Sequence, residues 1–221
     1  MGRWGLVGTG RMASALHSTI LAMPDGEVVA VTSTSRRRAE TFASLHQIEG
    51  VYSSVEAMAR DRAVEFVYIA STNDRHHDDT ITCLDANRPV LVEKPFSMNR
   101  RQAEAMVQRA RMRQTFLMEA MWMRFQPAIL RLIELIEIET IGPIRHLSAN
   151  FVIVVPDDPE RRWFSAALGG GSVYDLGVYP LALAQMLLGR PEQVASLSVL
   201  GPTDVETQSG INLRYPNGAL A

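Results

Sequence analysis

The 221-residue sequence has one cysteine, Cys83, no apolar run long enough to cross a membrane, and a net charge of only −2. A single cysteine excludes an internal disulfide, which is typical of a reducing cytoplasm, so we expect a cytoplasmic protein with Cys83 as a packed thiol. The small net charge gives no electrostatic reason to expect nucleic acid or a membrane as a partner. No cluster of cysteine and histidine has the spacing of a zinc site, so no metal is expected.

Hydrophobic residues make up 47% of the chain, enough for a sizeable core. Strand and helix patterns alternate up to about residue 118, which predicts an α/β domain over residues 1–118 with a doubly wound, parallel sheet. The strand patterns cover 4–7, 27–32, 64–70, 89–93 and 115–118, and the helical patterns cover 12–22, 36–46, 54–60, 76–87 and 99–113.

The pattern changes in residues 119–221, for which we expect an α+β domain with an open antiparallel sheet. A helix is predicted over 127–136, with proline in its first turn, and strand-like runs follow at 144–155, 194–200 and 211–215. A Tyr-Pro-Asn-Gly segment ending at Gly218 predicts a hairpin, yet only three residues follow it. We therefore expect this domain to be incomplete, because the chain is either a fragment or naturally short.

A glycine loop lies between the first predicted strand and the first predicted helix. Its sequence matches the dinucleotide fingerprint, with alanine in the third glycine position. The first glycine allows a tight turn, the second lets backbone amides approach a diphosphate, and the helix N-terminus favours an anion. The candidate diphosphate contacts are Gly8, Thr9, Gly10, Arg11 and Met12.

The end of the second predicted strand indicates which dinucleotide would bind. An NAD site places Asp or Glu about 20 residues beyond the glycine loop, but here Ser33 and further hydroxyl residues precede Arg36, Arg37 and Arg38. Guanidinium and hydroxyl groups can bind a 2′-phosphate, and cations at a helix N-terminus oppose its dipole unless an anion is present. We predict NADP, with NAD possible; the alternative is that the arginines are merely solvated.

Lys94 follows an apolar strand pattern and precedes Pro95. In an open α/β sheet, ligands bind at the carboxyl edge, and a residue before proline is steered to an extended conformation. Lys94 is therefore either a solvated loop residue or a positioned catalytic group. A second candidate segment begins with three glycines at 169–171 and continues into a predicted helix, where Asp175 and Tyr179 are four positions apart and share a face. These two residues form either a surface pair or an acid–base pair in a cleft.

Together, the Gly8–Gly10 loop, the Glu-Lys-Pro segment at 93–95, and the glycine-rich segment leading to Asp175 and Tyr179 resemble the glucose–fructose oxidoreductase/inositol dehydrogenase (Gfo/Idh/MocA) family over the whole chain. Residues 119–125, and tyrosine where histidine is commoner, resemble the branch of dihydrodiol and NADP-linked D-xylose dehydrogenases. The resemblance implies a dinucleotide-binding Rossmann domain and a substrate and oligomerisation domain. It also implies hydride transfer to or from a sugar, polyol or trans-dihydrodiol, and a homodimer when the protein is full length. The alternative is a non-catalytic nucleotide-binding regulator or an inactive fragment of the same family.

The resemblance also implies further binding residues. Asn73 stands where many members carry proline, so the contacts near the nicotinamide stay open. For the aromatic residues implied in the substrate pocket, the alternative is a place in the core. For the arginine implied there, the alternative is a solvated loop residue. The implied cofactor contacts are Ser71, Thr72, Asn73, His77, Glu93 and Lys94, and the implied substrate contacts are Trp122, Phe125, Arg162 and Trp163.

A mechanism can be outlined from Lys94, Asp175 and Tyr179. A free phenol has a pKa of about 10, too high for a base at neutral pH. An ammonium about 4 Å away, at an effective dielectric constant of about 20, could stabilise the phenolate by up to about 4 kcal/mol before desolvation. Tyr179 would then be the acid–base group, with Asp175 orienting the substrate or Lys94. The other assignment makes Lys94 the proton carrier and Tyr179 a substrate contact.

Overall fold

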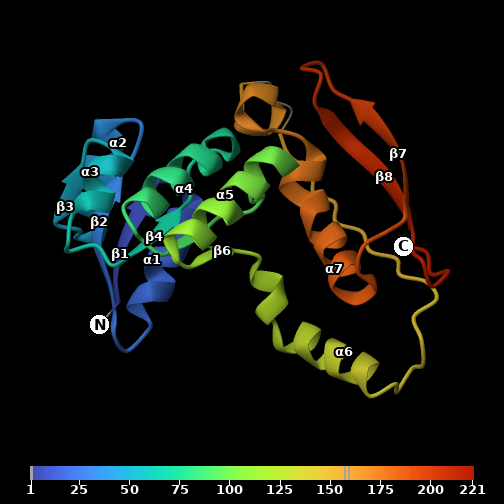
Figure 1. Cartoon of the computed structure of the whole chain (residues 1–221). Helices are drawn as coiled ribbons and strands as arrows, with labels where there is room; N and C mark the ends of the chain where they lie inside the picture. The colour runs from blue at the N-terminus through green and yellow to red at the C-terminus, as the bar shows by residue number, and fades with distance from the viewer. Residues whose placement is uncertain (1, 157, 159) are drawn as a thin grey trace. The chain divides into compact units, whose positions relative to one another are not determined.

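The computed structural model describes residues 2–156, 158 and 160–221. The chain forms two compact units, residues 1–120 and 121–221, each with its own sheet (Figure 1). Among the described residues, no helix has the length and apolar character needed to cross a membrane. Within the same residues, no group of three or more His, Cys, Asp or Glu side chains could hold a metal ion.

The first unit contains a six-stranded parallel sheet in the order β3-β2-β1-β4-β5-β6, the order of a doubly wound dinucleotide-binding fold. This confirms the predicted fold class. One strand, β3, is missing from the predicted set, because three residues are too few to show an alternating pattern. The strands are β1 (Gly2–Val7), β2 (Gly26–Thr32), β3 (Gly50–Tyr52), β4 (Phe66–Ile69), β5 (Val90–Val92) and β6 (Leu117–Glu119).

Helices cover both faces of this sheet. Neighbouring strand residues such as Leu6 and Val7 are both buried but belong to different apolar clusters, as expected for strands buried on both faces. One cluster includes residues of α1 and α2, and the other includes residues of α3, α4 and α5. Cys83 is buried in the second cluster, and burial raises the pKa of its thiol, as expected for a packed cysteine. The helices are α1 (Arg11–Leu21), α2 (Arg36–His46), α3 (Val55–Arg60), α4 (His76–Asp85) and α5 (Arg100–Arg113).

The second unit is built around α7 and a two-stranded antiparallel sheet. Its buried core joins Ala184 of α7 to Leu213 of β8 and to Tyr215, which directly follows that strand. The predicted helix at 127–136 is present as α6, with proline in its first turn. The elements are α6 (Pro127–Glu137), α7 (Val178–Leu188), β7 (Gln193–Leu200) and β8 (Glu206–Arg214).

The strand predicted at 144–155 is wrong. Among the described residues of this segment there is only one isolated bridge, between His146 and Leu220, and Val154 is 99% exposed. Apolar alternation indicates that a segment suits a sheet surface, but a strand forms only where a partner offers its backbone groups, and β7 and β8 pair with each other. The predicted hairpin does form, because Tyr215 N–H donates to Ala219 O at 3.0 Å.

Candidate functional site

The carboxyl ends of the strands in the first unit lie along one edge of the sheet. Val7 of β1 pairs with Thr32 of β2 and Ile69 of β4. Ile69 pairs in turn with Val92 of β5, which pairs with Glu119 of β6. The loops that follow these strands therefore start side by side, and the strand order reverses between β1 and β4. This is where ligands bind in open α/β sheets.

The glycine loop after β1 has the space and the donors for a diphosphate. Gly8 has a φ of +109°, and a Cβ atom there would lie 2.4 Å from Ala70 O, so only glycine fits. A Cβ atom at Gly10 would meet nothing within 4 Å, which leaves the approach to α1 open. Gly10 caps α1 without a side-chain hydrogen bond, and the first turn holds no acidic residue. The backbone N–H groups at this helix start fit an anionic group such as a dinucleotide diphosphate.

The three arginines at the start of α2 differ in their contacts. Arg36 forms an exposed ion pair with Glu40 at 2.8 Å, a kind of pair that contributes little to stability. Arg38 Nη2 donates to Thr34 Oγ1 at 2.8 Å, which directs that guanidinium back over the β2–α2 loop. Arg37 is exposed, and none of the side-chain interactions among the described residues involves its guanidinium.

Ser33 directly follows β2, and its Oγ accepts the backbone N–H of Ser35 at 3.4 Å. Ser35 Oγ in turn accepts the N–H of Arg38 at 3.4 Å and caps α2. Hydroxyl groups therefore occupy the place where a carboxylate would oppose a 2′-phosphate. The only nearby acid identified on α2, Glu40, is already paired.

Lys94 follows β5 in a loop whose backbone is held by carboxylates. Its own N–H donates to Glu93 Oε2 at 3.1 Å, and the N–H of Phe96 donates to Glu119 Oε1 at 2.9 Å. Glu93 is buried, and its other oxygen accepts a hydrogen bond from the Tyr68 hydroxyl. These bonds satisfy buried acceptors and hold the backbone on both sides of Lys94, so the lysine side chain starts from a fixed position.

A histidine that was not predicted as a site residue completes this support. His76 is 1% exposed, its Nδ1 lies 2.8 Å from Pro95 O, and its Nε2 lies 3.3 Å from Ser71 O. Burial lowers the pKa of the ring below its ordinary value. A neutral ring carries one N–H, and in the tautomer with that N–H on Nδ1 it donates to Pro95 O. The sequence does carry a signal, because His76 lies on the same buried face of α4 as Thr80 and Cys83.

The loop after β4 carries the other contacts implied near the nicotinamide. Ser71 Oγ donates to the buried Asp79 at 2.8 Å, and Asn73 is buried. Thr72 O accepts an N–H that starts the short helical turn before α4. His77 instead pairs with the neighbouring exposed aspartate at 2.7 Å.

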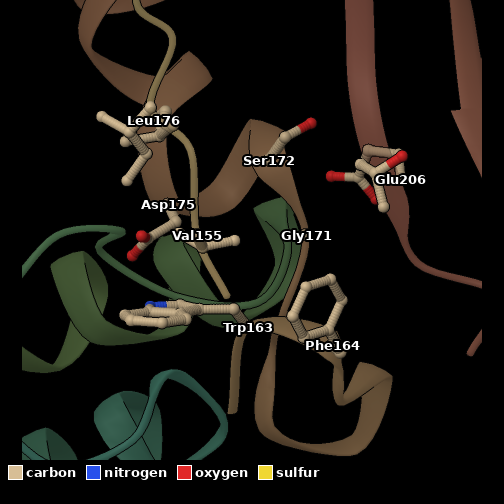
Figure 2. Close-up of a pocket in the computed structure, with 10 residues that line it drawn as sticks. Val155, Trp163, Phe164, Gly171, Ser172, Asp175, Leu176 and Glu206 are labelled. Carbon is tan, nitrogen blue, oxygen red and sulfur yellow. The ribbon is translucent and has the colours of Figure 1, made fainter. Parts of the chain in front are cut away.

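The second unit contains a pocket of about 80 Å³ beside its helical segment (Figure 2). Arg162 Nη2 donates to Asp175 at 3.1 Å, and the same guanidinium lies 5.7 Å from the ring centre of Trp163. Trp163 Nε1 and Ser172 Oγ are buried, and neither has a hydrogen-bond partner among the described residues. Trp163, Phe164, Ser172, Asp175 and Glu206 are among the residues that line this pocket.

Tyr179 lies in an aromatic cluster of the second unit. Trp122 Nε1 donates to the Tyr179 hydroxyl at 3.1 Å, and the Phe151 ring centre is 5.4 Å from that of Tyr179. Trp122 is 52% exposed and Phe125 is 59% exposed, so neither side chain is buried in a core of this chain. Of the implied substrate contacts, Trp163 lines the pocket of the second unit together with Asp175, whereas Phe125 and Arg162 do not line it. Arg162 is instead bonded to Asp175.

The spacing of Asp175 and Tyr179 predicts that both lie on one regular α-helix. The structure differs from that prediction. Asp175 is in a π-helical turn, Val173–Gly177, and Tyr179 is in the first turn of α7. Pro180 gives a physical reason, because a proline ring clashes with the carbonyl four residues earlier, here that of Leu176, and it lacks an N–H. A wider turn relieves that clash, and such turns are frequent at functional sites.

Two family models match the chain. A model described as an oxidoreductase family with an NAD-binding Rossmann fold matches residues 2–121, and one described as the GFO/IDH/MocA C-terminal domain matches residues 129–221. Trans-1,2-dihydrobenzene-1,2-diol dehydrogenases are among the similar curated proteins. The chain is 37% identical to that of Sus scrofa over 220 residues and 35% identical to that of Homo sapiens over 221 residues. These alignments cover 98% and 97% of this chain but only 65% of each relative.

Solved structures give the same result for the fold. A 3-ketoreductase from Actinomadura kijaniata, in complex with NADP and TDP-benzene, matches with a TM-score of 0.90 and 27% identity, over 100% of this chain and 68% of that chain. A probable dehydrogenase from Thermotoga maritima shares the fold, with a TM-score of 0.87 and 21% identity, over 99% of this chain and 66% of that one. With one family model matching more than half of its residues and a second matching most of the remainder, the chain belongs to the Gfo/Idh/MocA family of oxidoreductases.

Proposed function

We propose that the protein is an NADP-dependent oxidoreductase acting on an alcohol carbon of a sugar, polyol or trans-dihydrodiol. The observation that carries this proposal is the anchored Lys94 loop, which leaves the same sheet edge as the glycine loop. A lysine whose backbone is held on both sides suits a positioned catalytic group better than a solvated loop residue. The dihydrodiol dehydrogenases and the NADP-bound 3-ketoreductase among the similar proteins support this reaction class.

The first unit would hold the dinucleotide, and the second unit the substrate. The α1 N-terminus and the glycine loop fit the diphosphate, and the hydroxyl and guanidinium groups at the start of α2 suit a 2′-phosphate. When bound, the nicotinamide supplies the ring carbon that accepts or donates hydride. We propose the functional division at 1–118 and 119–221, and a homodimer for the complete protein.

Within this proposal Tyr179 holds and moves the proton of the substrate hydroxyl. The indole N–H of Trp122 already donates to the Tyr179 hydroxyl oxygen. A hydrogen-bond donor to this oxygen stabilises it when it carries negative charge. The Lys94 ammonium would add to that stabilisation. Asp175, paired with Arg162 at the pocket, would orient the substrate hydroxyl groups.

The direct test is turnover with NADP and a panel of aldoses, polyols and trans-dihydrodiols, followed by absorbance of the reduced nicotinamide. We expect measurable reduction of NADP with at least one substrate class, and loss of it in the Lys94→Ala variant. Binding of NADP without turnover on the whole panel, in both directions, would instead support the non-catalytic regulator.

A further inference from the structure

A carboxylate from the sheet of the second unit contacts the start of the helical segment that carries Asp175. Glu206 is the first residue of β8, and its Oε1 accepts the backbone N–H of Val173 at 3.0 Å. Val173 opens the π-helical turn, where an N–H has no partner within the turn itself. Ser172, at the cap position, makes no side-chain capping bond. The cap on this helical segment therefore comes from another element, far away in the sequence.

The glycines before this segment fit that contact. Gly171 has a φ of +117°, and a Cβ atom there would lie 2.4 Å from Glu206 Oε1. A Cβ atom at Gly170 would lie 2.5 Å from Trp163 O. Glycine is thus required at 170 by contact with backbone, and at 171 by its positive φ. The glycine run lets Glu206 reach the helix start, which gives it a structural role in the second unit.

We propose that Glu206 is a positioning residue, whose carboxylate sets the start of the helical segment and thereby the direction of Asp175 and Tyr179. A negative charge at a helix N-terminus is favourable because it meets unpaired N–H groups and the positive end of the helix dipole. Asp175 lies two residues beyond the capped N–H, and its own N–H donates to Gly171 O at 3.1 Å. Both carboxylates line the same pocket (Figure 2), but Asp175 is paired with Arg162 while Glu206 is bonded to backbone.

This inference rests on the proposed function, in which Tyr179 moves the proton and Asp175 orients the substrate. The test compares Glu206→Ala and Glu206→Gln in the full chain. Glu192→Ala is the matched control, since Glu192 is a half-exposed carboxylate beside the same sheet, paired with Arg214 at 2.7 Å, and is not at a helix start. Amide hydrogen exchange, cofactor affinity, kcat and KM are measured on all four proteins.

We expect exchange of the amides in 173–179 to become about tenfold faster in Glu206→Ala, a size typical of a lost helix cap, with the first unit unchanged. The value of kcat should fall by about 10- to 100-fold, because small displacements of catalytic groups slow a reaction by this much. NADP affinity should stay within about twofold. Glu206→Gln keeps an oxygen that can accept the N–H bond, so it should recover most of both losses. Glu192→Ala should match the wild type in exchange of this segment and in kcat.

Two results would overturn the inference. One is unchanged exchange at 173–179 in Glu206→Ala, which would mean that the carboxylate does not hold the helix start. The other is faster exchange with wild-type kcat, which would mean that the cap does not position the reacting groups. Absence of turnover in the wild type is a different outcome, because it refutes the proposed function while the exchange data still decide whether Glu206 is the cap.

Discussion

The two segments that carry the proposed acid–base groups are held in different ways. The loop around Lys94 has three backbone groups bonded to side chains, from Glu93, Glu119 and His76, all within a six-stranded sheet unit. The segment with Asp175 and Tyr179 starts at one carboxylate, Glu206, from a two-stranded sheet. The bonds around Lys94 belong to a buried network, where an unsatisfied group is costly. The bond from Glu206 is instead a cap at the start of a helical segment, and a lost cap loosens the first turn.

The Lys94 loop and the segment that carries Tyr179 also differ in burial. Glu93 and His76 are both buried, so their hydrogen bonds lie in a low-dielectric interior where an unpaired partner is costly. The helical segment of the second unit is only half-buried and depends on close glycine contacts. We expect damage to the Lys94 loop to appear mainly as lost stability, and damage to the helical segment to appear mainly as lost kcat.

The largest expected effect tests whether the two segments serve one reaction. Lys94→Ala should nearly abolish turnover while NADP affinity stays within a few-fold, and Tyr179→Phe should lose at least about 10²-fold in kcat. If they act as a unit, the double variant should be little worse than either single variant, because such losses are strongly non-additive. Steady-state kinetics of the three variants measures this. Fully multiplicative losses would assign them independent roles, and near-native activity of Lys94→Ala would contradict the proposal.

The next effect sharpens the contrast in how the segments are anchored. His76→Ala leaves the buried Pro95 O without its donor, so we expect the free energy of unfolding to fall by about 1–3 kcal/mol. Urea unfolding measures the loss. His77→Ala is the control for stability, because its ring pairs with an exposed aspartate on the surface and should change the free energy of unfolding by no more than about 0.5 kcal/mol. Equal losses in the two variants would show that the His76 bonds contribute nothing.

A third prediction concerns the first unit alone. NADP should bind at least about tenfold more tightly than NAD, because hydroxyl and guanidinium groups follow β2 where a carboxylate would bind the ribose. Fluorescence titration with both cofactors is the measurement. Ser33→Asp should move the preference towards NAD by repelling the 2′-phosphate, with unfolding stability near that of the wild type. A wild-type preference for NAD would refute the cofactor assignment.

The smallest expected effect is a pH dependence of stability that originates in the first unit. Burial lowers the pKa of His76 and of His17 below the ordinary value of 6.5. Below pH 6.5 the unfolded chain therefore binds more protons than the folded chain, so stability is complete above that pH and declines as the pH falls through the lowered values. Urea unfolding between neutral and acidic pH measures this slope. His76→Gln should flatten it, and an unchanged slope would mean that His76 does not contribute.

Much of the first unit was predictable, because its elements are local and repetitive. The apolar strands, the capped helices and the glycine loop each show their pattern within a few residues, and parallel βαβ order follows from alternation. The predictions that failed have different physical reasons. Strand β3 is too short for a pattern, residues 144–155 have the pattern without a ladder partner, and the π-helical turn at 173–177 depends on how the chain accommodates Pro180.

The sequence by itself determined the doubly wound sheet, the glycine loop after β1 and the position of Lys94 after a buried strand, since these depend on periodicity and on the backbone limits of glycine and proline. Only the tertiary structure decided what holds the candidate groups. The bond from His76 to Pro95 spans 19 positions, and the one from Glu206 to Val173 spans 33. Such partners are selected by the packing of whole elements, which brings distant residues to hydrogen-bonding distance and leaves no periodic trace in the chain.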